Sequence, residues 1–105
     1  MGPMRRLSIT ACSVLQALAD GAHYGFDVID RTGLPSGTVY PALSRLERDG
    51  HVSSSWEAEA MAHAEGRPAR RYYKVTAPGV RVLREATEHY RTLLPALHRP
   101  VRGRA

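Results

Sequence analysis

The spacing of apolar residues changes midway along the chain from a helical period to an alternating one, and this change restricts the possible folds most. In the first half, apolar residues recur at intervals of three and four within stretches that end near Gly21, Gly33 and Gly50. Residues 52–56 and 71–75 then alternate as strands do. In a chain of 105 residues, this order predicts one small domain, mainly α with a two-stranded antiparallel hairpin.

The first two predicted helices are short, and each has a recognisable end. The apolar face of the first consists of Leu7, Ala11, Val14, Leu15 and Leu18. Ser8 or Thr10 can cap its start, and the pair at positions 20 and 21, Asp-Gly, can end it. The second helix covers residues 24–32, and Gly33 is expected to end it.

The stretch SGTVYPALSRLERDG, residues 36–50, predicts an amphipathic third helix. Val39, Leu43 and Leu46 share the face that is expected to pack on the first two helices. The opposite face and its flanks are small, polar or basic, and their members are Thr38, Tyr40, Pro41, Ser44, Arg45 and Arg48. Because Pro41 lacks the N–H that a helix interior uses, we expect the helix to begin at Thr38, with Pro41 in its first turn.

The two predicted strands are joined by residues 58–69, which show no useful period and are expected to form a loop with a basic tip. The residues that give this wing its basic character, with one stiffening proline, are Arg67, Pro68, Arg70 and Arg71. Trp56, Tyr72 and Tyr73 are expected to pack the hairpin rather than stack on bases, because alternating aromatic residues on strands commonly cover a core.

Thr76 can cap a final helix, whose apolar residues form a heptad-like seam. These residues are Leu83, Ala86, Tyr90, Leu93 and Leu94. The seam predicts either dimerisation with a partner helix or packing on the domain's own core, and Pro95 is expected to interrupt it. The resulting division is a unit of helices and hairpin over residues 4–76, a final helix over 77–97 whose seam is a candidate for dimerisation, and a basic flexible tail over 98–105.

The chain has 15 basic and 10 acidic residues, a net charge of +5, and every basic residue except Lys74 is arginine. Arginine binds phosphates and guanine edges through a planar fork, so an anionic partner such as nucleic acid is plausible. A strong compositional preference for arginine would give the same count. The charge alone therefore leaves both explanations open.

Other classes of protein are disfavoured by the sequence. A single cysteine, Cys12, excludes an intramolecular disulfide and a cysteine-cluster zinc site, which suits a cytoplasmic protein. No apolar run is long enough for a membrane span, so no membrane partner is expected. We find no catalytic constellation, no cofactor motif and no metal-ligand spacing around His63, and we expect no enzyme, no cofactor and no metal site.

The stretch YGFDVIDRTGLPSGTVYPALSRLERDGHVSSSWE, followed by GRPARRYYKVTAPG, closely resembles the PadR family of bacterial transcriptional regulators. The resemblance covers roughly residues 7–94. Tyr24 and Gly25 match the family's opening of the second helix, the GTVYP segment matches the opening of its recognition helix, and GRPARRYY matches the end of its wing. Thr76 begins the family's TPEG turn, but here it reads TAPG, without the acidic residue.

The resemblance implies a winged helix-turn-helix domain and a homodimer that pairs through the last helix, acting as a repressor on a pseudo-palindromic DNA operator. It also implies possible release of DNA by a small-molecule effector. Within the DNA-binding domain that this implies over residues 4–76, Arg45 or Arg48 would read guanine, Thr38 and Tyr40 would bind phosphate, and Pro41 and Ser44 on the same face would also contact DNA. Near the tip of the wing, electrostatic contacts with DNA would come from Arg67, Arg70 and Arg71, and Pro68 would stiffen the loop. Tyr24 is equally consistent with a phosphate contact or with packing.

A competing hypothesis is a protein–protein interaction module that uses the winged helix as a scaffold without specific DNA readout.

Overall fold

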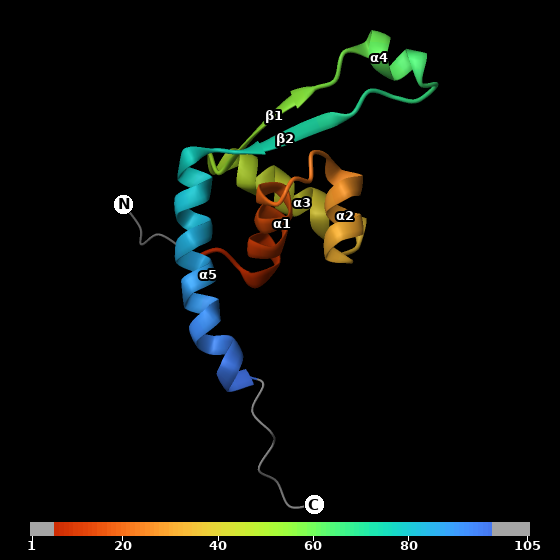
Figure 1. Cartoon of the computed structure of the whole chain (residues 1–105). Coiled ribbons are helices and arrows are strands. Elements are labelled where there is room, and N and C mark those ends of the chain that lie inside the picture. Colours follow the sequence, from red (N-terminus) through yellow and green to blue (C-terminus); the bar gives the residue numbers. More distant parts are fainter. Residues whose placement is uncertain (1–5, 98–105) are drawn as a thin grey trace, which may run out of the picture.

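The computed structural model describes residues 6–97 and confirms a mainly helical fold with a two-stranded antiparallel hairpin (Figure 1). The elements in chain order are α1 (Ile9–Ala19), α2 (Gly25–Thr32), α3 (Ser36–Arg48), β1 (Val52–Trp56), α4 (Glu59–Ala64), β2 (Arg71–Val75) and α5 (Ala77–Leu97). The predicted tail over residues 98–105 lies outside the described residues. Within the described part, no helix is both long and apolar enough to cross a membrane.

The predicted ends of the first two helices are confirmed. Ser8 is the N-cap of α1, and its Oγ accepts a hydrogen bond from the Ala11 N–H at 3.0 Å. Gly33 ends α2 with a φ of 73°, a left-handed conformation that glycine adopts without strain. The Gly33 N–H donates to the Ile29 carbonyl at 2.8 Å, so the last turn of α2 is closed by the backbone.

α3 begins earlier than the sequence predicted. The helix starts at Ser36, and Pro35 occupies its N-cap position, so the expected start at Thr38 is wrong. The carbonyl of Pro35 accepts from the N–H groups of Thr38 at 2.9 Å and Val39 at 3.0 Å, which extends the helix by two residues. Pro41 is therefore the sixth helical residue and leaves the Gly37 carbonyl without its usual donor.

One core holds the helices and the hairpin together. Val39, Leu43 and Leu46 of α3 are 0, 0 and 2% exposed, as their shared face predicted. They meet the buried side chains of α1 and α2, and the core continues into the hairpin and α5. The core members that follow α3 in the chain are Val52, Tyr73, Val82, Leu83 and Ala86. Burial of these apolar side chains is the main stabilising contribution to the domain.

The hairpin projects beyond the helices, with α4 at its far end (Figure 1). β1 and β2 pair antiparallel in a register that sets Val52 opposite Val75 and Trp56 opposite Arg71. The hairpin is anchored at its base, where the Tyr73 N–H donates to the His23 carbonyl at 2.8 Å. The wing is thus attached to the turn between α1 and α2 as well as to α3.

The connection between the strands is not wholly a loop, because it contains α4. The helical sequence EAMAHA is rich in alanine and lacks glycine, proline and β-branched residues, so its helix propensity is high although it is too short to show a period. Gly66 follows with a φ of 68°, and the Arg67 N–H donates to the Ala62 carbonyl at 3.1 Å. The tip of the wing is therefore an ordered turn of helix.

α5 begins where Thr76 was predicted to cap it. The Thr76 Oγ1 accepts from the Gly79 N–H at 3.1 Å and donates to the Gly50 carbonyl at 2.6 Å. The helix runs through Pro95 to Leu97, which agrees with the predicted range 77–97, so Pro95 does not interrupt the helix itself. Pro95 is the third residue from the end of α5, where a missing N–H removes a single backbone hydrogen bond.

Candidate nucleic-acid interface

The side of α3 that faces away from the core is the first part of the candidate interface. Its exposed members are Tyr40, Pro41, Ser44, Arg45 and Arg48, and Thr38 beside them is half-buried. Arg48 approaches the Asp49 carboxylate at 3.8 Å, but both side chains are more than half exposed, so the pair is weak. Arg45 forms no ion pair with any residue in the part that the structure describes. Both guanidinium groups are thus available to an anionic partner.

Tyr40 is held against the start of α2. A Cβ at Gly25 would lie 2.4 Å from Tyr40 Cε1 and 2.6 Å from the Tyr40 hydroxyl, so only glycine leaves room for this ring. The sequence identified Gly25 only through its place in a family motif. The structure gives the physical reason for it: Gly25 sets the position of an aromatic residue on the exposed face of α3.

Tyr24 packs the hairpin against α2. Its ring lies edge-on to the ring of Tyr72, with centroids 5.9 Å apart, and an isolated β-bridge joins the two residues. The guanidinium of Arg70 lies 4.3 Å from the centroid of the Tyr24 ring. These contacts favour the packing interpretation of Tyr24, and its contact with phosphate stays a prediction.

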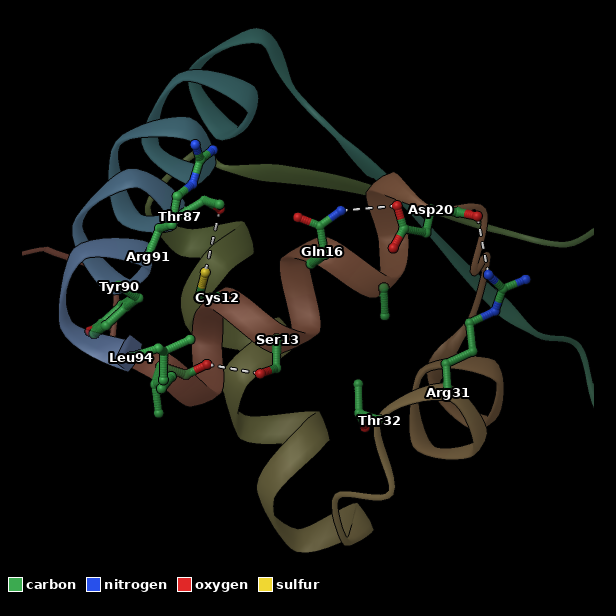
Figure 2. Close-up of a pocket in the computed structure, with 12 residues that line it drawn as sticks. Cys12, Ser13, Gln16, Asp20, Arg31, Thr32, Thr87, Tyr90, Arg91 and Leu94 are labelled. Atoms are coloured by element: carbon green, nitrogen blue, oxygen red, sulfur yellow. Dashed lines mark hydrogen bonds between the residues drawn. The ribbon is translucent and has the colours of Figure 1, made fainter. Parts of the chain in front are cut away.

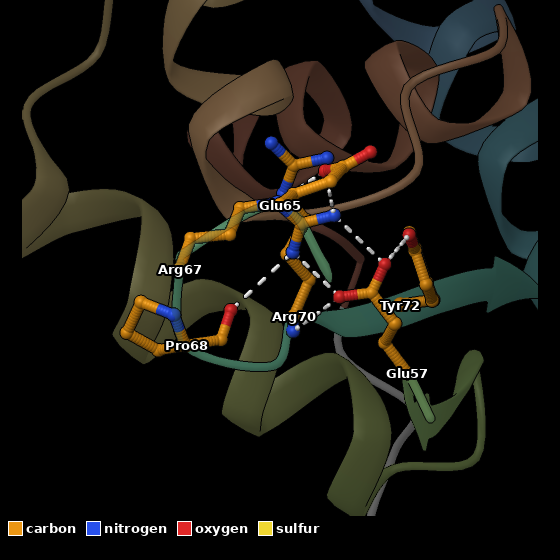
Figure 3. Close-up of polar contacts among 6 residues, drawn as sticks. All are labelled: Glu57, Glu65, Arg67, Pro68, Arg70 and Tyr72. Carbon is orange, nitrogen blue, oxygen red and sulfur yellow. Dashed lines mark hydrogen bonds and ion pairs between the residues drawn. The ribbon is translucent and has the colours of Figure 1, made fainter. Parts of the chain in front are cut away.

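Glu57 collects hydrogen bonds at the point where the strands separate (Figure 3). Its carboxylate accepts from Arg67 Nη2 at 2.9 Å, from the Tyr72 hydroxyl at 3.0 Å and from the Arg70 backbone N–H at 3.2 Å. Arg67 also donates to Glu65 at 2.8 Å. The hydrogen bond from Arg67, followed by those from Tyr72 and Arg70, lowers the pKa of Glu57 to about 2.

A second carboxylate, Glu47, links α3 to both strands. It accepts a hydrogen bond from the Ser54 hydroxyl, and Arg71 Nη2 donates to its Oε1 at 3.0 Å. Arg71 also donates from Nε to Ser54 Oγ at 3.0 Å. The Ser54 hydrogen bond, with Arg71 beside it, holds the pKa of Glu47 below its usual value. This network fixes the wing relative to α3.

The expectation that Arg67, Arg70 and Arg71 all make electrostatic contacts with DNA stays a prediction, but the structure shows that the three side chains differ in their partners. Arg67 and Arg71 are bound by carboxylates of the same chain, and Arg70 lies just before β2, where the two strands separate, with its guanidinium over the Tyr24 ring. The tip is formed by α4, which carries an acidic residue, Glu59, in its first turn. Glu47 and Glu57 were not assigned this role from the sequence, because their partners are 24 and 10 positions away along the chain.

An aromatic cleft of about 370 Å³ lies between α2, α3 and the hairpin. Its aromatic lining includes Phe26 and Trp56, which are 68 and 66% exposed. The prediction that Trp56 packs within the hairpin is wrong. Trp56 lies at the end of β1, beyond the part of the hairpin that the helices cover, and the Arg71 guanidinium lies 5.5 Å from its ring centroid.

A second hollow, an apolar groove of about 570 Å³, lies between α1, the end of α2 and α5 (Figure 2). Ile9 and Leu94 line it and are 51 and 37% exposed. Cys12 is partly buried, with its Sγ 4.0 Å from Thr87 Oγ1. Just before the start of α1, the Leu7 carbonyl accepts a hydrogen bond from the Tyr90 hydroxyl of α5 at 2.7 Å.

The packing of α5 on α1 divides the predicted dimerisation seam into a buried part and an open part. Leu83 and Ala86 are 7 and 0% exposed because α5 packs on α1 of the same chain, so the seam prediction is corrected for these two residues. Tyr90 is half-buried, whereas Leu93 is 43% exposed and Leu94 lies at the groove. Only the later part of the seam is open to a partner.

A helical core, a helix with one free polar and basic face and a hairpin beside it define a winged helix-turn-helix protein. The family model described as the transcriptional regulator PadR-like family matches residues 14–85. The chain belongs to this family and is a DNA-binding regulator of transcription. Comparison with curated protein sequences gives no significant match.

Solved structures show the same fold. A PadR family transcription regulator from Clostridium difficile R20291 is 21% identical, with a TM-score of 0.72 over 86% of this chain and 95% of that one. A PadR-like transcription factor from Bacteroides fragilis is 26% identical, with a TM-score of 0.65 over 85% of each chain. BpsR of Bordetella bronchiseptica, whose DNA binding is regulated by 6-hydroxynicotinic acid, is 21% identical, with a TM-score of 0.72 over 90% of this chain and 67% of that one.

Proposed function

We propose that the protein is a homodimeric repressor that binds a pseudo-palindromic DNA operator through α3. The observation that carries this proposal is the division of α3 into a fully buried apolar face and an exposed face with two arginines. A helix of this kind fits the major groove, where base edges present distinct patterns of donors and acceptors.

In this proposal the residues of α3 have different roles. Arg45 and Arg48 read guanine, since a bidentate guanidinium contact to O6 and N7 discriminates between bases by about 1–3 kcal/mol. Thr38 and Tyr40 bind phosphate, which sets the register of the helix. Pro41 and Ser44 lie between these groups on the same exposed face, close to the base edges.

The second copy is proposed to pack on the groove between α1 and α5. The exposed apolar side chains of Ile9 and Leu94 line this groove, and Leu93 is exposed next to Leu94 on α5. A symmetric dimer would bury these side chains in both copies. Two α3 helices related by this symmetry would meet half-sites about one helical turn apart. A small-molecule effector that entered the groove would change the geometry of the pair, as a ligand regulates DNA binding by BpsR.

The experiment is operator selection from random DNA, followed by mobility shift of the selected sequence at rising salt. We expect a palindromic motif and affinity that falls as a power of salt concentration, since several phosphates are contacted. Arg45→Ala and Arg48→Ala should each lose preference at one position of the half-site. Selection without a motif, together with a monomer in size-exclusion chromatography, would instead support the interaction-module hypothesis.

A further inference from the structure

The three arginines of the hairpin differ in the partners that hold them. Arg67 donates to Glu57 and Glu65, and Arg71 donates to Glu47. Arg70 forms no ion pair with the residues that the structure describes, and its guanidinium lies over the Tyr24 ring at 4.3 Å. Arg70 is therefore the one guanidinium of the three whose charge is not already matched by a carboxylate of the same chain.

Arg70 lines the aromatic cleft of about 370 Å³, whose lining contains arginines and aromatic rings but, among residues 6–97, no carboxylate side chain. Phe26 comes from α2, Tyr40 from α3 and Trp56 from β1, so three elements converge on it. This chemistry is complementary to one unit of a DNA strand. A phosphodiester is a single anion, and the attached deoxyribose presents carbon to the aromatic walls.

We propose that this cleft binds one sugar–phosphate unit of the operator backbone, with Arg70 as the cation that meets the phosphate and Phe26 and Trp56 against the deoxyribose. The inference rests on the proposed function and deepens it, because it reduces the electrostatic contact of the wing from three arginines to one. The Tyr24 ring packs against the Arg70 guanidinium, and Tyr40 lines the cleft on the side of α3.

Glu57 is a positioning residue in this site. Its carboxylate accepts from the Arg70 backbone N–H at 3.2 Å and from the Tyr72 hydroxyl at 3.0 Å, which fixes the chain where the Arg70 side chain begins. The same carboxylate is only 6% exposed and is matched by Arg67. Moving Arg67 to a phosphate would leave Glu57 buried and unmatched, so Arg67 stays with the protein when DNA binds.

The salt dependence of operator affinity distinguishes these roles. Each phosphate that a cation neutralises contributes about 0.9 to the slope of log affinity against log salt on duplex DNA. We expect Arg70→Ala to lower the magnitude of this slope by about 0.9 and Arg70→Lys to restore it. Lys74→Ala, which removes an exposed charge on β2 away from the cleft, is the matched control and should keep the slope.

Arg67→Ala should keep the slope but lower the thermal unfolding midpoint of the protein, which Arg70→Ala should leave nearly unchanged. A slope that falls with Arg67→Ala and not with Arg70→Ala would overturn the proposal. Where Arg67→Ala does not fold, Arg71→Ala takes its place as the variant of a carboxylate-bound arginine, and its slope is compared with that of Arg70→Ala. A wild-type protein that selects no operator would contradict the proposed function itself.

The apolar side of the site has an independent readout. Trp56 is the only tryptophan of the chain, so its fluorescence reports on the cleft directly. Saturating operator DNA should quench or shift this emission, and Phe26→Ala should weaken affinity without changing the salt slope. Emission that stays the same at full occupancy would show that the deoxyribose does not enter the cleft.

Discussion

Gly25 lies so close to the ring of Tyr40 that the Cβ of any other residue would clash with this ring. The sequence showed that Tyr40 lies on a flank of α3 but gave no sign that a glycine 15 positions earlier makes room for it. The same holds for Glu57 and Arg67, whose pairing depends on how the hairpin folds back on itself. Periodicity assigns a residue to a face, whereas contacts between faces need the folded chain.

Gly25→Ala should displace the Tyr40 ring and weaken operator binding. The clash is with the ring of a side chain that is 41% exposed, so the ring can move while the backbone keeps its fold. We expect Gly25→Ala and Tyr40→Ala to lose affinity to similar extents, and the double variant to lose little more than either. Additive losses in a fluorescence-anisotropy titration would show that the two residues act separately.

Glu57→Gln should destabilise the protein at neutral pH but not in strong acid. The pKa of Glu57 falls from 4.5 to about 2 on folding, so its contribution to stability is complete above pH 4.5 and is lost as pH falls toward 2. The difference in thermal midpoint between wild type and Glu57→Gln should therefore shrink over this range. Glu59→Gln, which changes an exposed carboxylate of α4, should show no such convergence.

Among the elements, the helices and strands with a clear period were predicted correctly, and the errors fall where local chemistry decides an end. α1, α2, β1, β2 and α5 occur where the pattern placed them. α4 was missed because six residues are too few for a period, and the start of α3 was misplaced because Pro35 supplies a carbonyl that closes the first turn.

Pro41→Ala should stabilise α3. Alanine restores an N–H for the Gly37 carbonyl and removes the ring that crowds it, a change worth up to about 3 kcal/mol in a helix interior. Urea denaturation should show a higher midpoint with an unchanged slope. If operator affinity falls at the same time, the ring contacts DNA. A lower denaturation midpoint would mean that the core requires the helix geometry that proline imposes.

Gly79→Ala should destabilise the junction between α3, β1 and α5. A Cβ at Gly79 would lie 2.0 Å from the His51 carbonyl oxygen, a backbone atom that cannot move alone. The start of α5 would have to shift, at a cost of about 1–3 kcal/mol. Gly37→Ala is the matched control, since it also lies in the first turn of a long helix and has no atom within 4 Å. Equal denaturation midpoints for the two variants would contradict this.

At the scale of the molecule, one chain presents two unlike surfaces on a shared core. The exposed face of α3 and the aromatic cleft carry arginine and aromatic residues, while the groove between α1 and α5 is apolar. The fold class followed from the order of the periodic segments. The location of the proposed dimer surface did not, because Leu83 and Leu93 belong to one seam in the sequence but only Leu83 is covered by α1.

Leu94→Glu should separate the proposed dimer. In a symmetric pair every substitution occurs twice, and burying one leucine side chain contributes about 1.5–3 kcal/mol, so two copies account for about 3–6 kcal/mol of association free energy. Since about 1.4 kcal/mol is a tenfold change, dissociation should become at least about 100-fold easier. Sedimentation should then give a monomer, and binding to a full palindrome should approach binding to a single half-site.

The control is Val80→Glu, at an exposed apolar position in the first turn of α5 and outside the groove, which should remain a dimer. A Leu94→Glu protein that stays dimeric would place the partner on another surface.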